Sequence, residues 1–321
     1  MSARKSLRSL AAVMTASILV TAPVVADETM RGTSTNDTWM GFTVLSGGKG
    51  YAPSPLGDVH YRDIGPRDYE HPIMILHQSP MSMIQFAEAQ NALADMGVRA
   101  ITVDTPGYGM SDLPPHQPTI EEYGANLEYV LDHLGIDKVL IAGHHTGAQI
   151  AATFAANFPD RVIGVILHGA ALFNEEELAG YQSRIGTATG TGRTPQPDGS
   201  HFVRRFGFPP PEPGRQEIQD AKTWLTITSY VQGPDIGHYA AFHYNMMPDF
   251  MAIKAPGMIM TDLRDDVHYI DVRAAETRPD FKYVEFSDGN LLEMMAQPEK
   301  WARVAKEFAD EIKQEQRASV E

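Results

Sequence analysis

The stretch that decides the fold is residues 139–157, which read Val-Leu-Ile-Ala-Gly-His-His-Thr-Gly-Ala-Gln-Ile-Ala-Ala-Thr-Phe-Ala-Ala-Asn. Its apolar start predicts a buried strand, and its small-residue second half predicts a helix. The two are joined by Gly143-His144-His145-Thr146-Gly147, in which the glycines permit a tight turn and close packing of strand against helix. We therefore expect a strand–turn–helix unit that presents His145 at the carboxyl end of the strand.

The flanking sequence repeats the same alternation of apolar runs and helical patterns. Fully apolar strands that alternate with helices indicate a parallel sheet covered on both faces, so the predicted class is α/β with a doubly wound, mostly parallel sheet. The helix predicted after Pro118 opens with a capping box formed by Thr119 and Glu122. The predicted strands are 73–76, 100–103 and 162–167, and the predicted helices are 83–96 and 119–134.

The alternation breaks after about Leu172. Residues 173–255 are rich in Gly, Pro, Tyr and His, and they show only weak periodicity. The strand pattern resumes at residues 258–260 and 281–286, and an amphipathic helix follows from Pro298 to about Ile312. We therefore expect a core formed by residues 27–172 and 256–321, with residues 173–255 as a cap inserted over the carboxyl edge of the sheet.

Residues 1–26 have the pattern of a secretory signal peptide. Arg4, Lys5 and Arg8 form a basic region, a short apolar run follows, and Val24-Val25-Ala26 offers small residues for cleavage before Asp27. The apolar run is short for a transmembrane span, although an uncleaved anchor is the alternative. The pattern predicts a secreted protein, periplasmic in a Gram-negative cell, with no membrane association after cleavage.

Composition excludes several classes of protein. The 321 residues are 43% apolar and 21% charged, as in an ordinary globular protein. A formal net charge of −15 repels phosphate backbones, so we expect no nucleic-acid partner. The chain has no cysteine, which excludes disulfides, thiolate nucleophiles and cysteine-ligated metals. No cofactor and no metal are expected.

Three segments together resemble the α/β-hydrolase superfamily. Residues 143–147 have the form of its nucleophile elbow, Gly-x-Ser-x-Gly. Residues 76–80, Leu-His-Gln-Ser-Pro, are similar to its oxyanion loop, with Gln78 where Gly is usual, and residues 104–112 resemble its Asp-x-Pro-Gly-x-Gly-x-Ser stretch. The resemblance covers roughly residues 57–172 and 256–312, and it implies a capped α/β-hydrolase fold.

The resemblance also shows how the chain departs from the family's catalytic triad. The nucleophile position is His145 instead of Ser, Cys or Asp. The acid position is Asp265, although Asp262 or Asp266 would match a shifted loop. The histidine position is Asn290, or Leu291 if one extra residue precedes Pro298, and neither can act as a base. A Ser–His–Asp mechanism therefore cannot be transferred to this chain.

His145 could nevertheless carry chemistry. A residue at the amino end of a helix meets the positive end of the helix dipole, which should lower the pKa of the imidazole. A neutral imidazole can act as a general base or as a nucleophile. The resemblance places the backbone amides of Gln78 and Thr146 where the family stabilises an oxyanion, and Asp265 could orient His145. The alternative is that His145 only fills the elbow of an inactive hydrolase.

Other histidines have structural and functional interpretations. His144 is expected to pack sideways, away from His145, which argues against a metal site at this pair. His268 is the best candidate for a relocated base. His77 is more readily explained as a hydrogen-bonded anchor than as a catalyst, and His201 could reach the pocket from the insertion.

The sequence leaves three functions open. The first is hydrolysis of a small, partly aromatic molecule with an ester, lactone or similar bond. Aromatic residues are frequent between positions 224 and 244, and they would favour an aromatic substrate if they line a pocket. They could equally form the core of the cap. The second is a base-catalysed lyase or isomerase on the same fold. The third is a non-catalytic ligand-binding pseudo-hydrolase. The partner in each case is a small molecule, and the oligomeric state is left open.

Overall fold

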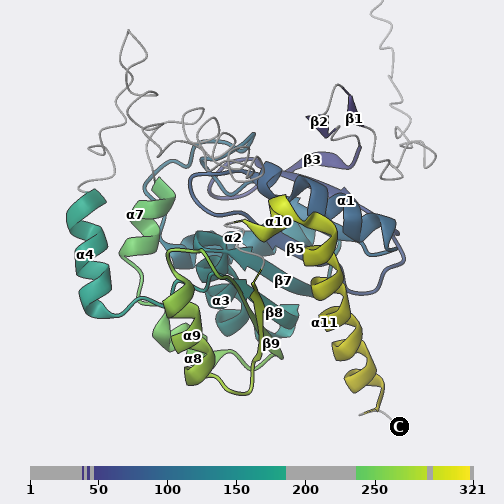
Figure 1. The fold of residues 1–321 in the computed structure, drawn as a ribbon. Coiled ribbons are helices and arrows are strands. Elements are labelled where there is room, and N and C mark those ends of the chain that lie inside the picture. The colour runs from purple at the N-terminus through teal and green to yellow at the C-terminus, as the bar shows by residue number, and fades with distance from the viewer. Residues whose placement is uncertain (1–37, 40–41, 44–46, 186–235, 288–291, 319–321) are drawn as a thin grey trace, which may run out of the picture. The chain divides into compact units, whose positions relative to one another are not determined.

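The computed structural model describes residues 38–39, 42–43, 47–185, 236–287 and 292–318, and a single eight-stranded sheet organises them (Figure 1). The strand order is β10-β9-β8-β7-β5-β6-β4-β3, in which β3 and β4 run antiparallel to their neighbours and the others are parallel. The strands are β3 (Lys49–Ala52), β4 (Val59–Ile64), β5 (Ile73–Leu76), β6 (Ala100–Val103), β7 (Val139–His144), β8 (Val162–His168), β9 (Gly257–Asp262) and β10 (Lys282–Phe286). The short strands β1 (Thr38–Trp39) and β2 (Phe42–Thr43) pair only with each other.

Helices cover both faces of the sheet. Figure 1 shows α1, α10 and α11 on one side and α2, α3, α8 and α9 on the other. The helices are α1 (Ala87–Asp95), α2 (Ile120–His133), α3 (Thr146–Asn157), α4 (Glu175–Ile185), α7 (Ile236–Phe242), α8 (Met247–Ala252), α9 (His268–Thr277), α10 (Glu293–Ala296) and α11 (Pro298–Ala318), with 3₁₀ turns η2 (Met83–Phe86) and η3 (Pro159–Arg161). None of the helices within the described ranges is long and apolar enough to cross a membrane.

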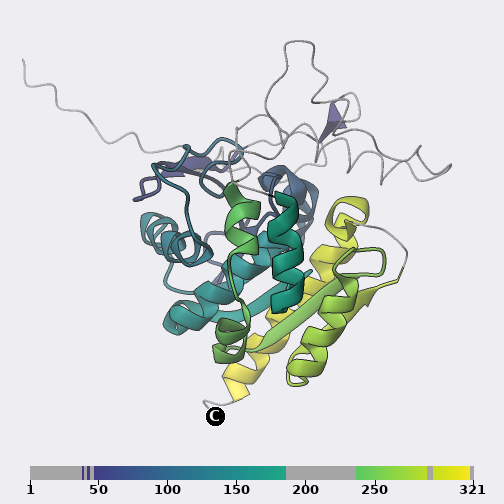
Figure 2. The ribbon, with the colours of Figure 1, turned by 90° about the vertical axis from the view of Figure 1, so that its left-hand side faces the viewer.

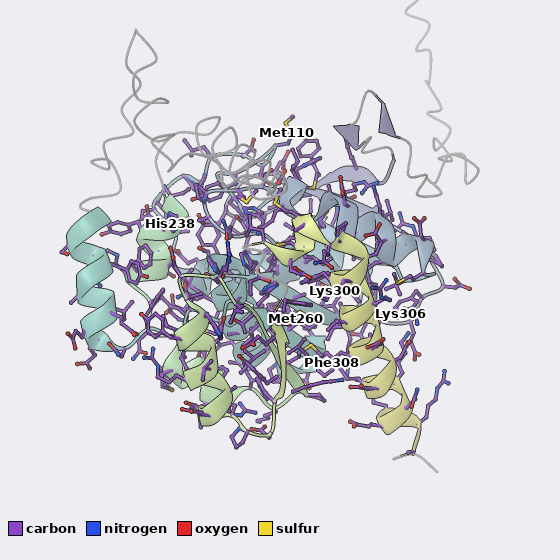
Figure 3. All side chains as sticks on the ribbon, viewed as in Figure 1. Met110, His238, Met260, Lys300, Lys306 and Phe308 are labelled. Carbon is purple, nitrogen blue, oxygen red and sulfur yellow. The ribbon has the colours of Figure 1, made fainter. Side chains whose placement is uncertain are left out.

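The core has two layers because each buried strand contributes apolar side chains to both faces. Along β5, Met74 and Leu76 pack with α2 and α3, whereas Ile73 and Ile75 pack with α1 and α11. Figure 3 shows Met260 of β9 and Phe308 of α11, two side chains of the second layer. A sheet buried on both faces explains why its strands read as continuous apolar runs.

The structure confirms the predicted fold class and the α/β-hydrolase fold. β5 and β6 have the predicted limits, and α2 begins with the predicted capping box, in which Thr119 and Glu122 exchange side-chain and backbone hydrogen bonds. The final helix α11 extends to Ala318, beyond the predicted end at about Ile312. The antiparallel strands β3 and β4 are not among the predicted elements.

The segments between β8 and β9 that the structure describes lie against loops at the carboxyl edge of the sheet. The backbone N–H of Gly237 in α7 donates to the Tyr108 hydroxyl at 2.7 Å, and the Gln117 side chain donates to the Ile236 carbonyl at 2.8 Å. Figures 1 and 2 both show α4 beside α7, and the Tyr181 and Phe242 rings stack between them at 4.5 Å. The role of residues 173–255 as a cap remains a prediction.

The glycines of the turn between β7 and α3 are required by close backbone approach. A Cβ on Gly147 would overlap the carbonyl oxygens of Leu76 and His77, and a Cβ on Gly143 would overlap the backbone of Gly147. We therefore expect Gly147→Ala to lower the free energy of unfolding by about 1–3 kcal/mol, because main-chain atoms must move to admit the methyl group. Urea denaturation measures this change.

A second helical glycine provides the control. Gly180 lies in α4, and a Cβ there would meet nothing within 4 Å. Gly180→Ala should therefore leave stability unchanged or raise it by up to about 1 kcal/mol, as helix propensity alone dictates. Equal effects of the two substitutions would contradict the close packing of α3 on β5.

Candidate active site

His145 occupies the sharp turn between β7 and α3. Its backbone has φ 48° and ψ −110°, a left-handed conformation that non-glycine residues rarely adopt. The N–H of His145 donates to the His168 carbonyl, and the His145 carbonyl accepts from Gln149. The side chain is 29% exposed, so it reaches solvent at the carboxyl edge of the sheet. Strained backbone of this kind persists where the surroundings enforce it, as at catalytic turns.

The structure brings His145 and Asp265 together. Asp265 lies in the loop between β9 and α9, and its Oδ2 is 2.7 Å from Nε2 of His145. Its Oδ1 accepts from the Val267 N–H, which fixes the carboxylate. Gly169, at the end of β8, makes room for the pair, because a Cβ there would overlap the His145 ring. Two residues 120 positions apart thus form a partly buried hydrogen bond at the turn.

The pKa of His145 is raised, whereas the sequence predicted that the helix terminus would lower it. Burial lowers the pKa of the imidazole, but the charge of Asp265 and its hydrogen bond raise the pKa by more. Asp271 and Asp262 contribute in the same direction. In turn, burial raises the pKa of the Asp265 carboxyl, but the charge of His145, its hydrogen bond and the nearby His144 ring hold that pKa well below its usual range.

The hydrogen bond to Asp265 sets the tautomer of His145. An ionised carboxylate only accepts hydrogen bonds, so the ring proton of His145 lies on Nε2. Within the described residues, Nδ1 of His145 has no hydrogen-bond partner. The ring therefore presents a lone pair on Nδ1, which is the arrangement of a general base.

His144 lies against His145 and does not diverge from it as expected. The two rings stack with centroids 4.1 Å apart, and His144 is fully buried. Its Nδ1 accepts from Nε2 of Gln85 at 2.8 Å, and its Nε2 lies 3.8 Å from Asp265 Oδ2. Burial and the neighbouring charge of His145 hold the pKa of His144 well below its usual value. His144 thus belongs to the site as an uncharged neighbour.

Of the two backbone amides predicted to stabilise an oxyanion, one is already engaged in a hydrogen bond. The Gln78 N–H already donates to Oε1 of Gln85 at 2.9 Å, so this amide is not free for a substrate. Among the described residues, no hydrogen bond engages the N–H of Ser79 or of Thr146. The available amides are therefore those of Thr146, as predicted from the resemblance, and of Ser79, which the sequence analysis did not select although it follows Gln78 in the same loop.

A second histidine–carboxylate pair lies beneath the first. Nδ1 of His168 accepts from the Trp301 indole N–H at 3.1 Å, and its Nε2 faces Asp262 Oδ2 at 3.3 Å. The His168 ring contacts His144 edge to face at 4.8 Å. His168, Asp262 and Trp301 are all buried. This pair therefore forms the buried surroundings of His144 and does not reach solvent.

Two clusters have the spacing of metal ligands, but their hydrogen bonds do not fit a metal. The clusters are His144, His168 and Asp262, and His144, His145 and Asp265. Histidine ligands normally donate their second ring N–H to an acceptor. Here the partners of His144 and His168 are donors, so the ring protons lie on the Nε2 atoms that would have to bind the ion.

The remaining predicted residues lie apart from His145 or outside the described ranges. His268 begins α9, and its Nε2 faces Glu285 at 3.3 Å. His77 donates from Nδ1 to the Gln78 carbonyl and accepts at Nε2 from the Thr105 N–H, as an anchor would. Burial lowers the pKa of His77. Asn290 and His201 lie outside the described residues.

Comparison with known proteins finds the alpha/beta hydrolase fold in part of the sequence. The sequence model for the alpha/beta hydrolase fold matches residues 71–206. Epoxide hydrolase B of Mycobacterium tuberculosis H37Rv is 34% identical over 111 residues, which are 34% of this chain and 31% of that protein. The 2-hydroxy-6-oxononadienedioate/2-hydroxy-6-oxononatrienedioate hydrolase of Klebsiella pneumoniae is 31% identical over 115 residues, or 35% of this chain and 39% of that one. These matches span about a third of the relatives' length.

Solved structures extend the likeness to most of the fold. A thermophilic esterase from Thermogutta terrifontis matches with a TM-score of 0.67 at 21% identity, over 82% of this chain and 98% of the esterase. The enol-lactonase from Burkholderia xenovorans LB400 has a TM-score of 0.65 at 20% identity, over 81% of this chain and all of the lactonase. These structures show that the chain has the α/β-hydrolase fold.

Proposed function

We propose that this protein is a hydrolase of a small, partly aromatic molecule with an ester, lactone or similar bond, and that His145 is its general base. The observation that carries the proposal is the 2.7 Å hydrogen bond from His145 Nε2 to Asp265, which directs Nδ1, unpartnered among the described residues, away from the carboxylate. The hydrolases among the relatives, which include an esterase and an enol-lactonase, support this reaction type.

The proposed reaction needs no serine. Nδ1 of His145 removes a proton from water while the water oxygen attacks the carbonyl carbon, and the carbonyl electrons move to its oxygen. The amide N–H groups of Thr146 and Ser79 stabilise that oxyanion. Collapse of the intermediate breaks the bond to the leaving oxygen, which takes the proton back from Nδ1. Asp265 stabilises the imidazolium that exists between the two steps.

The same imidazole could instead attack the carbonyl itself, and kinetics separates the two routes. A general base gives linear release of chromophore from the first turnover, whereas a nucleophilic imidazole gives a burst through an acyl-enzyme. We expect linear release, because the raised pKa of His145 suits a base and no second imidazole within the described residues faces Nδ1 to assist deacylation.

The test of function is a screen with 4-nitrophenyl acetate, 4-nitrophenyl phenylacetate and an aromatic lactone. Turnover well above that of an equal concentration of free imidazole supports the proposal. Proton exchange or elimination without hydrolysis would favour a lyase or isomerase that uses the same base. Tight binding with no turnover of any kind would identify a ligand-binding pseudo-hydrolase.

Export is part of the proposal, and it rests on residues 1–26, which lie outside the described residues. We propose that this segment is removed, so that the protein acts outside the cytoplasm, in the periplasm of a Gram-negative cell. Amino-terminal sequencing of the protein recovered from that compartment should begin at Asp27. An intact Met1 on protein from the soluble cytoplasm would contradict export.

A further inference from the structure

Gln85 is a buried side chain that connects the loop after β5 to the turn residues of the site. It lies in the 3₁₀ turn η2 and is 1% exposed. Its Oε1 accepts from the Gln78 N–H at 2.9 Å, and its Nε2 donates to Nδ1 of His144 at 2.8 Å. One amide group therefore bridges two elements that converge on His145.

The orientation of this amide follows from the nature of its partners. A backbone N–H can only donate, so the atom of Gln85 that faces Gln78 must be the oxygen. The NH₂ group then faces His144, and a ring nitrogen that receives a donor must carry a lone pair. The hydrogen bonds thus place the proton of His144 on Nε2, on the side of Asp265.

The indole of Trp301 fixes the tautomer of His168 in the same way, because it donates to Nδ1. An indole N–H cannot accept, so the proton of His168 also lies on Nε2, facing Asp262. Two of the three adjacent imidazoles therefore have Nδ1 occupied by a donor and Nε2 already protonated. Neither can accept a proton without losing a buried hydrogen bond.

We propose that Gln85 is a positioning residue that fixes the proton of His144 on Nε2 and so makes His145 the one imidazole of the three that takes up a proton. The charged and titratable groups that act on His145 are Asp265 from the β9–α9 loop, Asp262 from β9, Asp271 from α9 and the stacked imidazole of His144, behind which lies His168. With His144 uncharged, no cation stacks on the His145 ring when it becomes protonated.

The position of the His144 proton also affects the Asp265 carboxylate. In the assigned tautomer, the Nε2–H of His144 points toward the carboxylate that holds His145, at 3.8 Å. The opposite tautomer would place a lone pair against that carboxylate, which is repulsive in a buried site. Gln85 therefore acts on the His145–Asp265 pair through His144, without contact with the reacting atoms.

The test is the replacement Gln85→Glu, followed by long-range proton–nitrogen-15 correlation spectra of the histidine rings. In the wild type, His144 should keep its single proton on Nε2 from about pH 5.5 to about pH 8.5 while His145 titrates. In Gln85→Glu, at a pH at which the new carboxyl is ionised, the carboxylate has no donor for His144, so a proton appears on Nδ1. A merely structural role for Gln85 would change stability without this change of tautomer.

The matched control is Gln90→Glu in the next helix. Gln90 is also buried, and its NH₂ group donates to the carbonyls of Arg62 and Ala100, not to a histidine. The same change of amide to acid therefore removes two buried hydrogen bonds but should leave the His144 tautomer unchanged. If Gln85→Glu does not fold, Gln85→Met keeps the volume and removes the donor, and it should give a mixture of tautomers. A wild-type His144 with its proton on Nδ1, or one that titrates with His145, would overturn the inference.

The kinetic readout rests on the proposed function, whereas the spectra do not. If the protein hydrolyses one of the esters in the screen, Gln85→Glu should lower kcat/KM about tenfold, the equivalent of one pKa unit of interaction. Wild-type protein without hydrolytic activity but with the expected His144 tautomer would refute the proposed function alone. An unchanged tautomer in Gln85→Glu would refute the role of Gln85 alone.

Discussion

Replacement of His145 by alanine should lower kcat/KM for an ester that the wild type hydrolyses by about 10²–10⁴-fold, the range that loss of a general base produces. The reason is that His145 provides a partly exposed imidazole held by Asp265, and no residue in the described ranges hydrogen-bonds its Nδ1 lone pair. The measurement is the initial rate of chromophore release under subsaturating substrate, with circular dichroism to verify that the variant is folded.

His268→Ala is the matched control for this loss. His268 was the alternative base suggested by the sequence, but its ring faces Glu285 instead of His145. We expect its removal to change kcat/KM by less than about twofold, because it removes a histidine without touching the site. Full activity in His145→Ala together with a large loss in His268→Ala would refute the assignment of the base.

Asp265→Asn should lower kcat/KM by about as much as His145→Ala does. The Val267 N–H requires an acceptor, so the oxygen of the new amide would stay there and its NH₂ group would face His145 Nε2. That contact moves the ring proton of His145 to Nδ1 and removes the lone pair that the base needs. A wrong tautomer of this kind costs up to about 10⁴-fold in a catalytic triad, so we expect a loss of about 10²–10⁴-fold in kcat/KM.

The neighbouring residue supplies the control for Asp265→Asn. Asp266 is exposed and follows Asp265 in the same loop. Asp266→Asn makes the same chemical change with the same loss of charge, and it should leave kcat/KM within about twofold of the wild type. If both variants lose activity equally, the effect comes from the charge of the loop and not from the tautomer of His145.

The sequence predicted the central strands because burial on both faces makes them continuous apolar runs, as in β5 and β6. It did not predict β4, where Arg62 and Asp63 interrupt the apolar pattern. Both side chains are nevertheless buried, because Gln90 and Asn91 accept from Arg62, and Arg99 pairs with Asp63. Those partners are distant in the sequence, so the pattern of β4 alone could not reveal that its charges are satisfied.

In the candidate site too, some features could be predicted from the sequence and others could not. His145 and Asp265 could be identified because each lies at a fixed place in the family's order of strands. The stacking of His144 on His145 and the bridge through Gln85 depend on contacts across 59 residues, and no local pattern encodes them. The predicted direction of the His145 pKa shift was wrong for a related reason. The helix terminus is visible in the sequence, whereas the carboxylates that surround His145 are assembled only by the fold.

The most direct test of the central claim is the pH dependence of kcat/KM for a hydrolysed ester. A general base must be deprotonated, so activity should rise with pH, and the raised pKa of His145 places the midpoint above the ordinary value of about 6.5. Asp265→Asn should move any residual midpoint to lower pH, because it removes the carboxylate that favours the imidazolium. A wild-type midpoint at or below about 6.5, or a profile that His145→Ala leaves unchanged, would contradict a His145–Asp265 base.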